Sequence, residues 1–199
     1  MDSIINKSYN NHYNIIYKNF LYEISNNSKI LCIGQKEYNL LNHFSHIIKK
    51  KNLEIHIKID DISILEKIKE EIKCEDCEKN IILIGNSDSD NNNYFDYILI
   101  FGIKSLDNFS KQLSKLYSFL NDNGVIYLYS SLSNEKNINK KNYIRTTLRL
   151  NEIYSLSDVL EIIENNYQLK IESINILKKV NYIFYGNHVL YKIILVRNL

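Results

Sequence analysis

Short apolar runs alternate with segments of helical periodicity along most of this chain, and this alternation limits the folds open to it. Four runs read as buried strands and a fifth segment alternates apolar with polar residues: KILCI (29–33), IILI (81–84), YILIF (97–101), VIYLYS (125–130) and LEIHIKI (53–59). Parallel strands buried on both faces read as such runs, and parallel neighbours need crossover connections, usually helices. We therefore expect an α/β fold with a mostly parallel sheet and helices on both faces.

Between the strand-like runs, apolar residues recur three and four positions apart, as on the buried side of a helix. The predicted helices span 13–24, 40–52, 62–72, 106–120 and 155–166. We expect Asp107 or Asn108 to cap the fourth of them. SLSD (155–158) is expected to form a capping box at the start of the fifth, because its Ser and Asp can each bond the backbone near the other.

The tail carries two long strand-like segments, QLKIESINIL (168–177) and HVLYKIILV (188–196), joined around Gly186. They predict an antiparallel hairpin that completes a seven-stranded sheet. No internal repeat and no linker rich in Pro or Gly divides the chain. We therefore expect one domain over 1–199, made of an N-terminal helical segment (1–28) and an α/β core (29–199).

Composition supports a globular protein, because 45% of the 199 residues are hydrophobic and 12% are aromatic. A net charge of +2 is too small to indicate a nucleic-acid or membrane partner. Three cysteines, an odd number, and the lack of a long uncharged apolar run favour a soluble protein in a reducing compartment. We expect a cytoplasmic location without a membrane partner.

Four phrases lie in a diagnostic order along the chain: DISILEKIKE, IILIGNSDSDNNNYFDYILIFGIKSL, LYSFLNDNGVIYLYS and SLSDVLEIIENNYQLKIESINI. Together with the order of elements, they resemble class I S-adenosylmethionine (SAM) dependent methyltransferases of Rossmann-like fold. The resemblance implies that Asp61, with Asp60 as the alternative, accepts hydrogen bonds from both ribose hydroxyls. It also places Asn86 beside the adenine, where the family has an acid, and the backbone of Ile100, Phe101 and Gly102 against SAM.

KILCIGQKEYNLL (29–41) stands where this family has an acid followed by a GxGxG turn. Here Cys32 replaces the acid, Gly34 is kept, and Lys36 and Tyr38 replace the second and third glycines. In the related dinucleotide turn the first glycine makes the sharp turn, the second admits the ligand and the third lets the helix approach. The resemblance therefore implies that Gly34 and Gln35 contact SAM through a degenerate motif.

Two functions follow from this resemblance. The first is a methyltransferase in which SAM activates its own methyl group and the protein aligns an unidentified small-molecule, protein or RNA substrate with it. No residue in IFGIKSL (100–106) is assigned as a base, so the catalytic residues stay unknown. The second is an inactive methyltransferase-like domain that binds a protein partner. It would resemble anamorsin-type iron–sulfur assembly proteins, whose cysteine-rich tail is absent here, or the stimulatory subunit of an RNA-modifying complex.

A basic segment at 136–149 follows the last apolar run of the sheet. Arg145 and Arg149 would share a face if this segment is helical. In methyltransferases the insertion at this point often shapes the substrate pocket, so both arginines are candidate contacts to an anionic substrate or a partner. The alternative without a function is a solvated basic loop, because nearby acidic residues weaken the positive electrostatic field of this segment.

Cysteine and histidine residues give no convincing metal or nucleophile site. Cys74 and Cys77 have CxxC spacing, but a tetrahedral metal needs two further ligands, and we expect a loop without chemistry. His43 and His46 lie near one face of a predicted helix without a matching third ligand. The other histidines are isolated, namely His12, His56 and His188. We therefore predict no metal.

Overall fold

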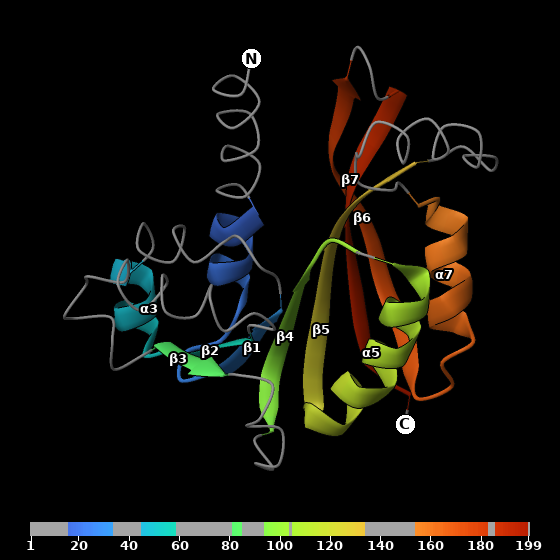
Figure 1. Cartoon of the computed structure of the whole chain (residues 1–199). Coiled ribbons are helices and arrows are strands. Elements are labelled where there is room, and N and C mark those ends of the chain that lie inside the picture. The colour runs from blue at the N-terminus through green and yellow to red at the C-terminus, as the bar shows by residue number, and fades with distance from the viewer. Residues whose placement is uncertain are drawn as a thin grey trace. The chain divides into compact units, whose positions relative to one another are not determined.

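The computed structural model describes residues 16–33, 45–58, 81–84, 94–103, 105–133, 154–182 and 186–198 (Figure 1). The chain forms two compact units, Met1–Tyr97 and Ile98–Leu199. Strand β4 (Phe95–Phe101) begins in the first unit and ends in the second. Hydrogen-bonded neighbours in the sheet follow the order β3-β2-β1-β4-β5-β7-β6. The predicted α/β class is confirmed.

The first unit contains three parallel strands. Parallel neighbours need crossover connections, which are usually helices. They are β1 (Lys29–Ile33), β2 (Glu54–Lys58) and β3 (Ile81–Ile84), and helix α3 (Ser45–Lys51) connects the first two. Residues 16–23 form a helix ahead of β1. The apolar row predicted for this helix is buried, namely Ile16, Tyr17, Phe20, Leu21 and Ile24.

Two asparagines tie the end of the first helical segment to the end of α3. Asn27 (φ 59°) and Asn52 (φ 52°) both adopt left-handed backbone conformations, which asparagine tolerates better than most residues. The Asn27 N–H donates to the Lys51 carbonyl at 2.8 Å. Lys51 Nζ in turn donates to the Ile24 carbonyl at 2.6 Å. These bonds anchor both helix ends just before β1 and β2 start.

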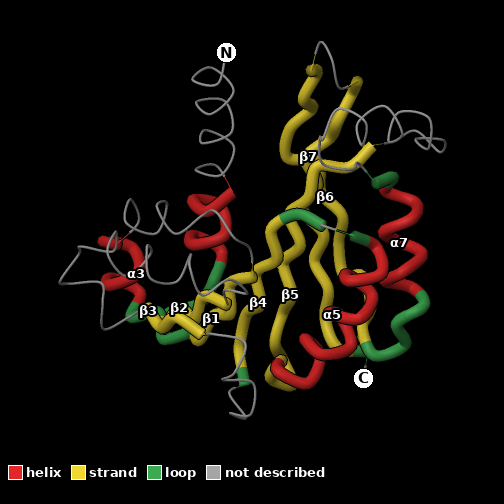
Figure 2. The backbone as a smooth tube through the Cα atoms, viewed as in Figure 1, coloured by secondary structure: helices red, strands yellow, loops and turns green. Residues whose placement is uncertain are grey.

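The second unit contains α5 (Leu106–Phe119), β5 (Leu120–Ser133), α7 (Leu156–Glu164), β6 (Leu169–Tyr182) and β7 (Gly186–Arg197). Strand β7 pairs antiparallel with both β5 and β6. Figure 2 shows these strands in yellow and helices α5 and α7 in red. The sheet is therefore mixed rather than mostly parallel, because the pairings of β7 are antiparallel whereas those among β1, β2 and β3 are parallel. The long terminal segments do form a hairpin.

The helix caps confirm one prediction and correct another. Ser155 and Asp158 form the expected capping box at α7. At α5 the N-cap is Ser105, whose hydroxyl accepts from the Asn108 N–H at 3.1 Å, so Asp107 and Asn108 are not the cap. The helix starts at Leu106, as predicted, and Ser105 caps it because it has the extended backbone and side-chain acceptor that an N-cap needs. The predicted helix at 62–72 lies outside the described residues.

Gly124 marks a close approach within the segment NDNG (121–124). Strand β5 already starts at Leu120, so this segment lies within the strand. A Cβ atom at Gly124 would lie 2.7 Å from Cδ1 and Cγ of Leu120, whose side chain is fully buried. Glycine is therefore required here for space rather than for backbone conformation.

We expect Gly124→Ala to destabilise the protein by about 1–3 kcal/mol, because the added methyl group must displace the buried Leu120 side chain. Chemical denaturation measures this loss. The neighbouring exposed change Asn123→Ala is the control, and we expect it to alter the free energy of unfolding by less than about 0.5 kcal/mol. Equal effects of the two changes would contradict the crowding at Gly124.

Candidate cofactor site

The carboxyl ends of β1, β2 and β3 lie level with one another. Ile33 at the end of β1 pairs with Lys58 at the end of β2, and Lys58 pairs with Ile84 at the end of β3. In open parallel sheets, ligands bind beyond the carboxyl ends of the strands. The ends of these three strands therefore lie where a nucleotide-like ligand binds in such a sheet.

The predicted cofactor residues of the first unit follow these strand ends directly. Gly34 and Gln35 come immediately after β1, Asp60 and Asp61 come shortly after β2, and Asn86 comes shortly after β3. All of them lie outside the described residues, as do Lys36 and Tyr38. Their approach to a ligand thus stays a prediction, although the strands that lead into them end level with one another.

The second unit places a turn at Gly102, where β4 ends. Gly102 has φ +67°, a left-handed conformation that side chains other than glycine rarely adopt. Its N–H donates to the Tyr129 carbonyl of β5 at 2.8 Å. A Cβ atom built on Gly102 would meet no atom of the described residues within 4 Å. The backbone is thus held in place, and none of the described residues occupies the space beside it.

The two residues before Gly102 differ in what they offer. Ile100 is 2% exposed, so only its backbone is left for a ligand. Phe101 is partly exposed and stacks on Tyr129, with 6.2 Å between ring centroids and 21° between ring planes. Tyr129 therefore fixes this turn twice, through its carbonyl and through its ring.

The segment that carries Arg145 and Arg149 has its two ends bonded to each other. The Ser133 N–H at the end of β5 donates to the Tyr154 carbonyl at 3.0 Å, just before α7 starts. Ser133 also forms a parallel bridge with Ser155. Both arginines lie outside the described residues. The residues that flank this segment, Ser133 and Tyr154, thus lie together at the carboxyl end of β5.

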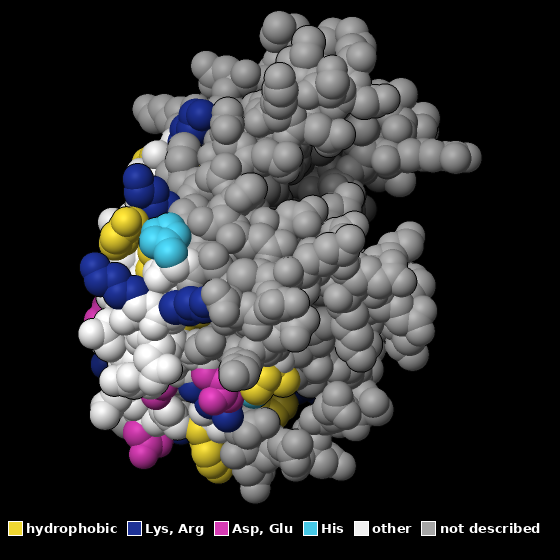
Figure 3. Space-filling model, turned by 90° about the vertical axis from the view of Figure 1, so that its left-hand side faces the viewer, with side chains coloured by type: hydrophobic (Ala, Val, Ile, Leu, Met, Phe, Trp, Pro, Cys, Tyr) yellow, Lys and Arg dark blue, Asp and Glu magenta, His cyan; other side chains and the backbone are white. Residues whose placement is uncertain are grey.

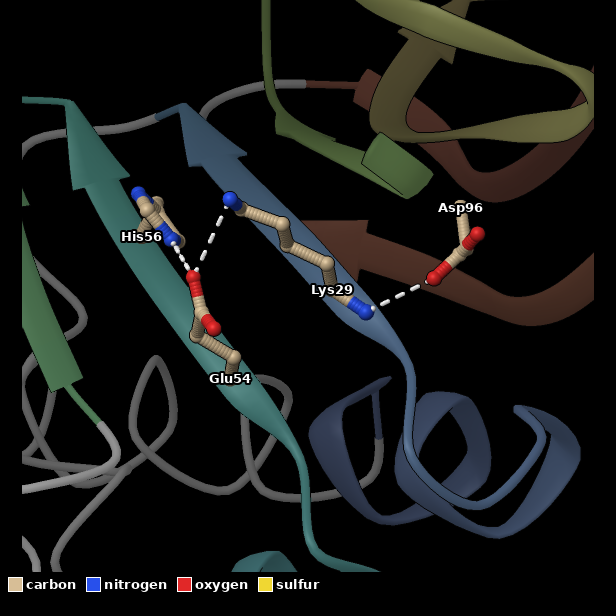
Figure 4. A network of polar contacts seen from close by, with 4 residues as sticks. All are labelled: Lys29, Glu54, His56 and Asp96. Atoms are coloured by element: carbon tan, nitrogen blue, oxygen red, sulfur yellow. Dashed lines mark hydrogen bonds and ion pairs between the residues drawn. The ribbon is translucent and has the colours of Figure 1, made fainter. Parts of the chain in front are cut away.

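A second polar cluster lies at the opposite, amino ends of the strands, and sequence reasoning missed it (Figure 4). Lys29 Nζ is 3.2 Å from Glu54 Oε1, and the same oxygen is bonded to His56 Nε2. The Lys29 backbone N–H donates to Asp96 Oδ2 at 2.8 Å. His56 was read as isolated, yet residues two apart on a strand share a face. Its spacing from Glu54 was therefore the available signal.

His56 is deeply buried although it is polar. It is 3% exposed, and its ring lies edge-on to Phe95 at 5.0 Å between centroids. Its Nδ1 atom is buried and has no hydrogen-bond partner among the described residues. Burial lowers the pKa of His56 below its ordinary value, and the bond to Glu54 opposes this shift without reversing it. The bond from His56 lowers the pKa of Glu54.

We expect acid to destabilise the protein through His56. Its pKa is lower in the folded chain than the ordinary 6.5, so below about that pH the unfolded chain binds the proton more readily and stability falls. Thermal melting from about pH 7.5 to about pH 5.5 should show a smaller fall in Tm for His56→Gln than for the wild type. His46→Gln, at an exposed position of α3, is the control and should keep the wild-type slope. An unchanged slope in His56→Gln would refute this role.

The other candidate groups add little. Groups of three or more metal-ligating side chains are absent from the part of the chain that the structure describes. Cys32 is buried in β1, whereas Cys74, Cys77 and His43 lie outside the described residues. On the face shown in Figure 3, the described surface carries both basic and acidic side chains.

None of the described helices has the length and apolar character needed to span a membrane.

Comparison with known proteins gives similarity in structure but not in sequence. No family model matches the chain, and no curated protein matches it either. Among solved structures, geranyl diphosphate C-methyltransferase from Streptomyces coelicolor, bound to Mg²⁺, geranyl diphosphate and S-adenosylhomocysteine, has a TM-score of 0.67 at 10% identity. The match covers 94% of this chain and 79% of that one.

Two further structures agree with this result. A SAM-dependent methyltransferase from Thiobacillus denitrificans in complex with S-adenosylhomocysteine has a TM-score of 0.64 at 7% identity, covering 93% of this chain and 91% of that one. Coclaurine N-methyltransferase, bound to N-methylheliamine and S-adenosylhomocysteine, has a TM-score of 0.68 at 11% identity, covering 92% and 70%. The chain therefore has the Rossmann-like fold of class I SAM-dependent methyltransferases.

Proposed function

We propose that this protein is a SAM-dependent methyltransferase that binds its cofactor at the carboxyl ends of the sheet's parallel strands. The observation that carries the proposal is the turn at Gly102. Its backbone is left-handed and fixed by the bond to Tyr129, and no described residue fills the space beside it. Similar folds that hold S-adenosylhomocysteine support the choice of ligand.

The described residues suit SAM at the places they reach. A side chain at Gly102 would fill the open space, whereas glycine leaves the backbone free to approach a ligand. In the first unit, β1, β2 and β3 end level with one another, and Gly34, Asp61 and Asn86 follow these ends in the sequence, which supports assigning them to one ligand. We propose that Asp61 binds the ribose, Asn86 the adenine and the turn at Gly34 and Gln35 the amino-acid part.

Bound SAM would supply a methyl group that its own sulfonium activates. The protein's task is then to orient the acceptor and exclude water rather than to perform acid or base chemistry. Phe101, stacked on Tyr129, keeps the β4 turn rigid for this purpose. Arg145 and Arg149 belong to the segment that follows the carboxyl end of β5. We propose that they bind an anionic part of the methyl acceptor.

A thermal-shift titration with SAM and S-adenosylhomocysteine tests this function. A ligand that binds only the folded state adds about 2.7 kcal/mol of stability at 100 times its Kd, so Tm should rise with both ligands. Adenosine and methionine, supplied separately, are the controls and should give smaller shifts. If neither SAM nor S-adenosylhomocysteine raises Tm at millimolar concentration, the proposed enzyme function fails. The alternative, an inactive domain that binds a protein partner, then takes its place.

A further inference from the structure

Strand β6 is the long outer edge of the second unit. It runs over Leu169–Tyr182, and among the described residues only β7 pairs with it. Ile174 and Ile176 on this strand are 41% and 55% exposed, although they are large and apolar. An edge strand with exposed apolar side chains presents unpaired backbone groups to another strand.

In the middle of β6, the apolar side chains lie on one face of the strand and the polar side chains on the other. Ile174 and Ile176 pair with the buried Ile193 and Tyr191 of β7, so both isoleucines point to one side. Ser173 and Asn175 point to the other side, where Asn175 Nδ2 donates to Ser173 Oγ at 3.1 Å.

Register shifts occur between Ile171 and Ser173 and again between Ile176 and Lys178. Such irregularities can protect an edge strand against pairing. Here they flank residues 173–176 and leave this central segment regular.

We propose that a second copy of this chain pairs antiparallel with β6, about a two-fold axis at Asn175. Directly opposite residues of antiparallel strands share a face. This register places Ile174 of each copy opposite Ile176 of the other, so four isoleucines cover one another on one side. It also brings Glu172 of each copy next to Lys178 of the other, and both side chains are exposed. Strand β6 is thus complementary to β6 of a second copy in both shape and charge.

The opposite edge of the sheet does not offer the same surface. Strand β3 at that edge has only four residues, Ile81–Ile84, and one described exposed apolar side chain, Ile82 at 41%. Self-pairing needs a strand long enough to carry both an apolar centre and flanking charges, so β6 is the edge that fits. Ile82 is then a matched control for the isoleucines of β6.

Sedimentation velocity over a concentration series tests the pairing. The wild type should change from the 23.6 kDa species to a species of twice that mass as concentration rises. Ile176→Lys should abolish the heavier species, because it places two like charges at the apolar centre. Ile82→Lys should leave it unchanged. Tm values close to the wild type would show that these exposed substitutions leave the fold intact.

Charge reversal tests the register itself. Glu172→Lys alone and Lys178→Glu alone each bring like charges together twice in the dimer, and each should raise its dissociation constant about tenfold. The double exchange should restore the wild-type value. A protein that stays at 23.6 kDa at every concentration would overturn the proposal. So would a dimer that Ile82→Lys disrupts as much as Ile176→Lys does, or one that the single charge reversals leave unchanged.

Discussion

Replacing Arg197 by methionine is expected to lower the free energy of unfolding by roughly 2–4 kcal/mol. The guanidinium at the end of β7 donates to three carbonyl groups where α5 ends and β5 begins. Nε bonds Asn121 at 3.1 Å, and Nη2 bonds Tyr117 at 3.3 Å and also Leu120. It also lies 4.3 Å from the centroid of the Tyr117 ring. Methionine keeps much of the apolar stem but removes the guanidinium donor from all three carbonyls, of which that of Tyr117 keeps its bond from the Leu120 N–H.

Two variants separate this effect from simple charge pairing. Arg197 is also 3.7 Å from Asp122, but the Asp122 side chain is 92% exposed, so Asp122→Asn should have little effect. Arg197→Lys keeps the charge but not the planar donor group and should fall between the wild type and the methionine variant. For a chain of this size, the methionine variant should lose roughly 4–16 °C in Tm. A loss in Asp122→Asn as large as in Arg197→Met would contradict the carbonyl-binding role.

Replacing Asp61 by alanine is expected to weaken SAM binding by roughly 10–100-fold. A carboxylate that accepts from both ribose hydroxyls makes charge-assisted hydrogen bonds, and losing them costs about 1.5–3 kcal/mol. Titration calorimetry on the variant and the wild type measures the ratio of Kd values. The melting temperature without ligand should stay the same, since the expected loss is one of ligand contacts.

Asp60→Ala is the matched variant for this experiment, because Asp60 is the neighbouring carboxylate that could take the same role. A large loss in Asp60→Ala with none in Asp61→Ala would move the ribose contact by one residue. Full SAM affinity in both single variants and in the double variant would contradict a carboxylate contact at the end of β2.

The fold followed from the sequence where apolar runs were continuous. KILCI and IILI each coincide with a strand, since a strand buried on both faces needs no polar positions. Strand β4 begins two residues before the predicted YILIF. Phe95 is buried there, and Asp96 bonds the start of β1. Such a contact joins residues far apart in the chain, so a local pattern could not show it.

The same limit applies to single polar residues whose role depends on tertiary structure. Asp107 or Asn108 was predicted as the cap instead of Ser105, because Ser, Asp and Asn all favour this position and only the backbone conformation distinguishes them. Arg197 is a lone cation near the end of the chain, and its three carbonyl partners belong to a segment about 80 residues earlier. His56 was missed because strand alternation reveals a shared face but not burial on both sides.

The candidate site was only partly predictable for a different reason. Of the residues assigned to SAM, Ile100, Phe101 and Gly102 lie in the described structure, and Gly102 has the open, left-handed turn that such a role needs. Gly34, Gln35, Asp61 and Asn86 are placed by sequence only, each just after a strand whose register is known. The degenerate turn, with Lys36 and Tyr38 where the family has glycine, therefore makes ligand binding the decisive property.

Isothermal titration calorimetry of the full chain with S-adenosylhomocysteine tests the central claim most directly. We expect saturable binding of one ligand per chain, weakened by Asp61→Ala and by Gly102→Val, whose side chain would enter the open space at the end of β4. The Gly102→Val protein should be compared at a temperature below its own melting transition, because the positive φ strains any side chain there. Absence of heat at millimolar ligand, with the wild-type protein folded, would contradict the claim that this fold still holds the cofactor.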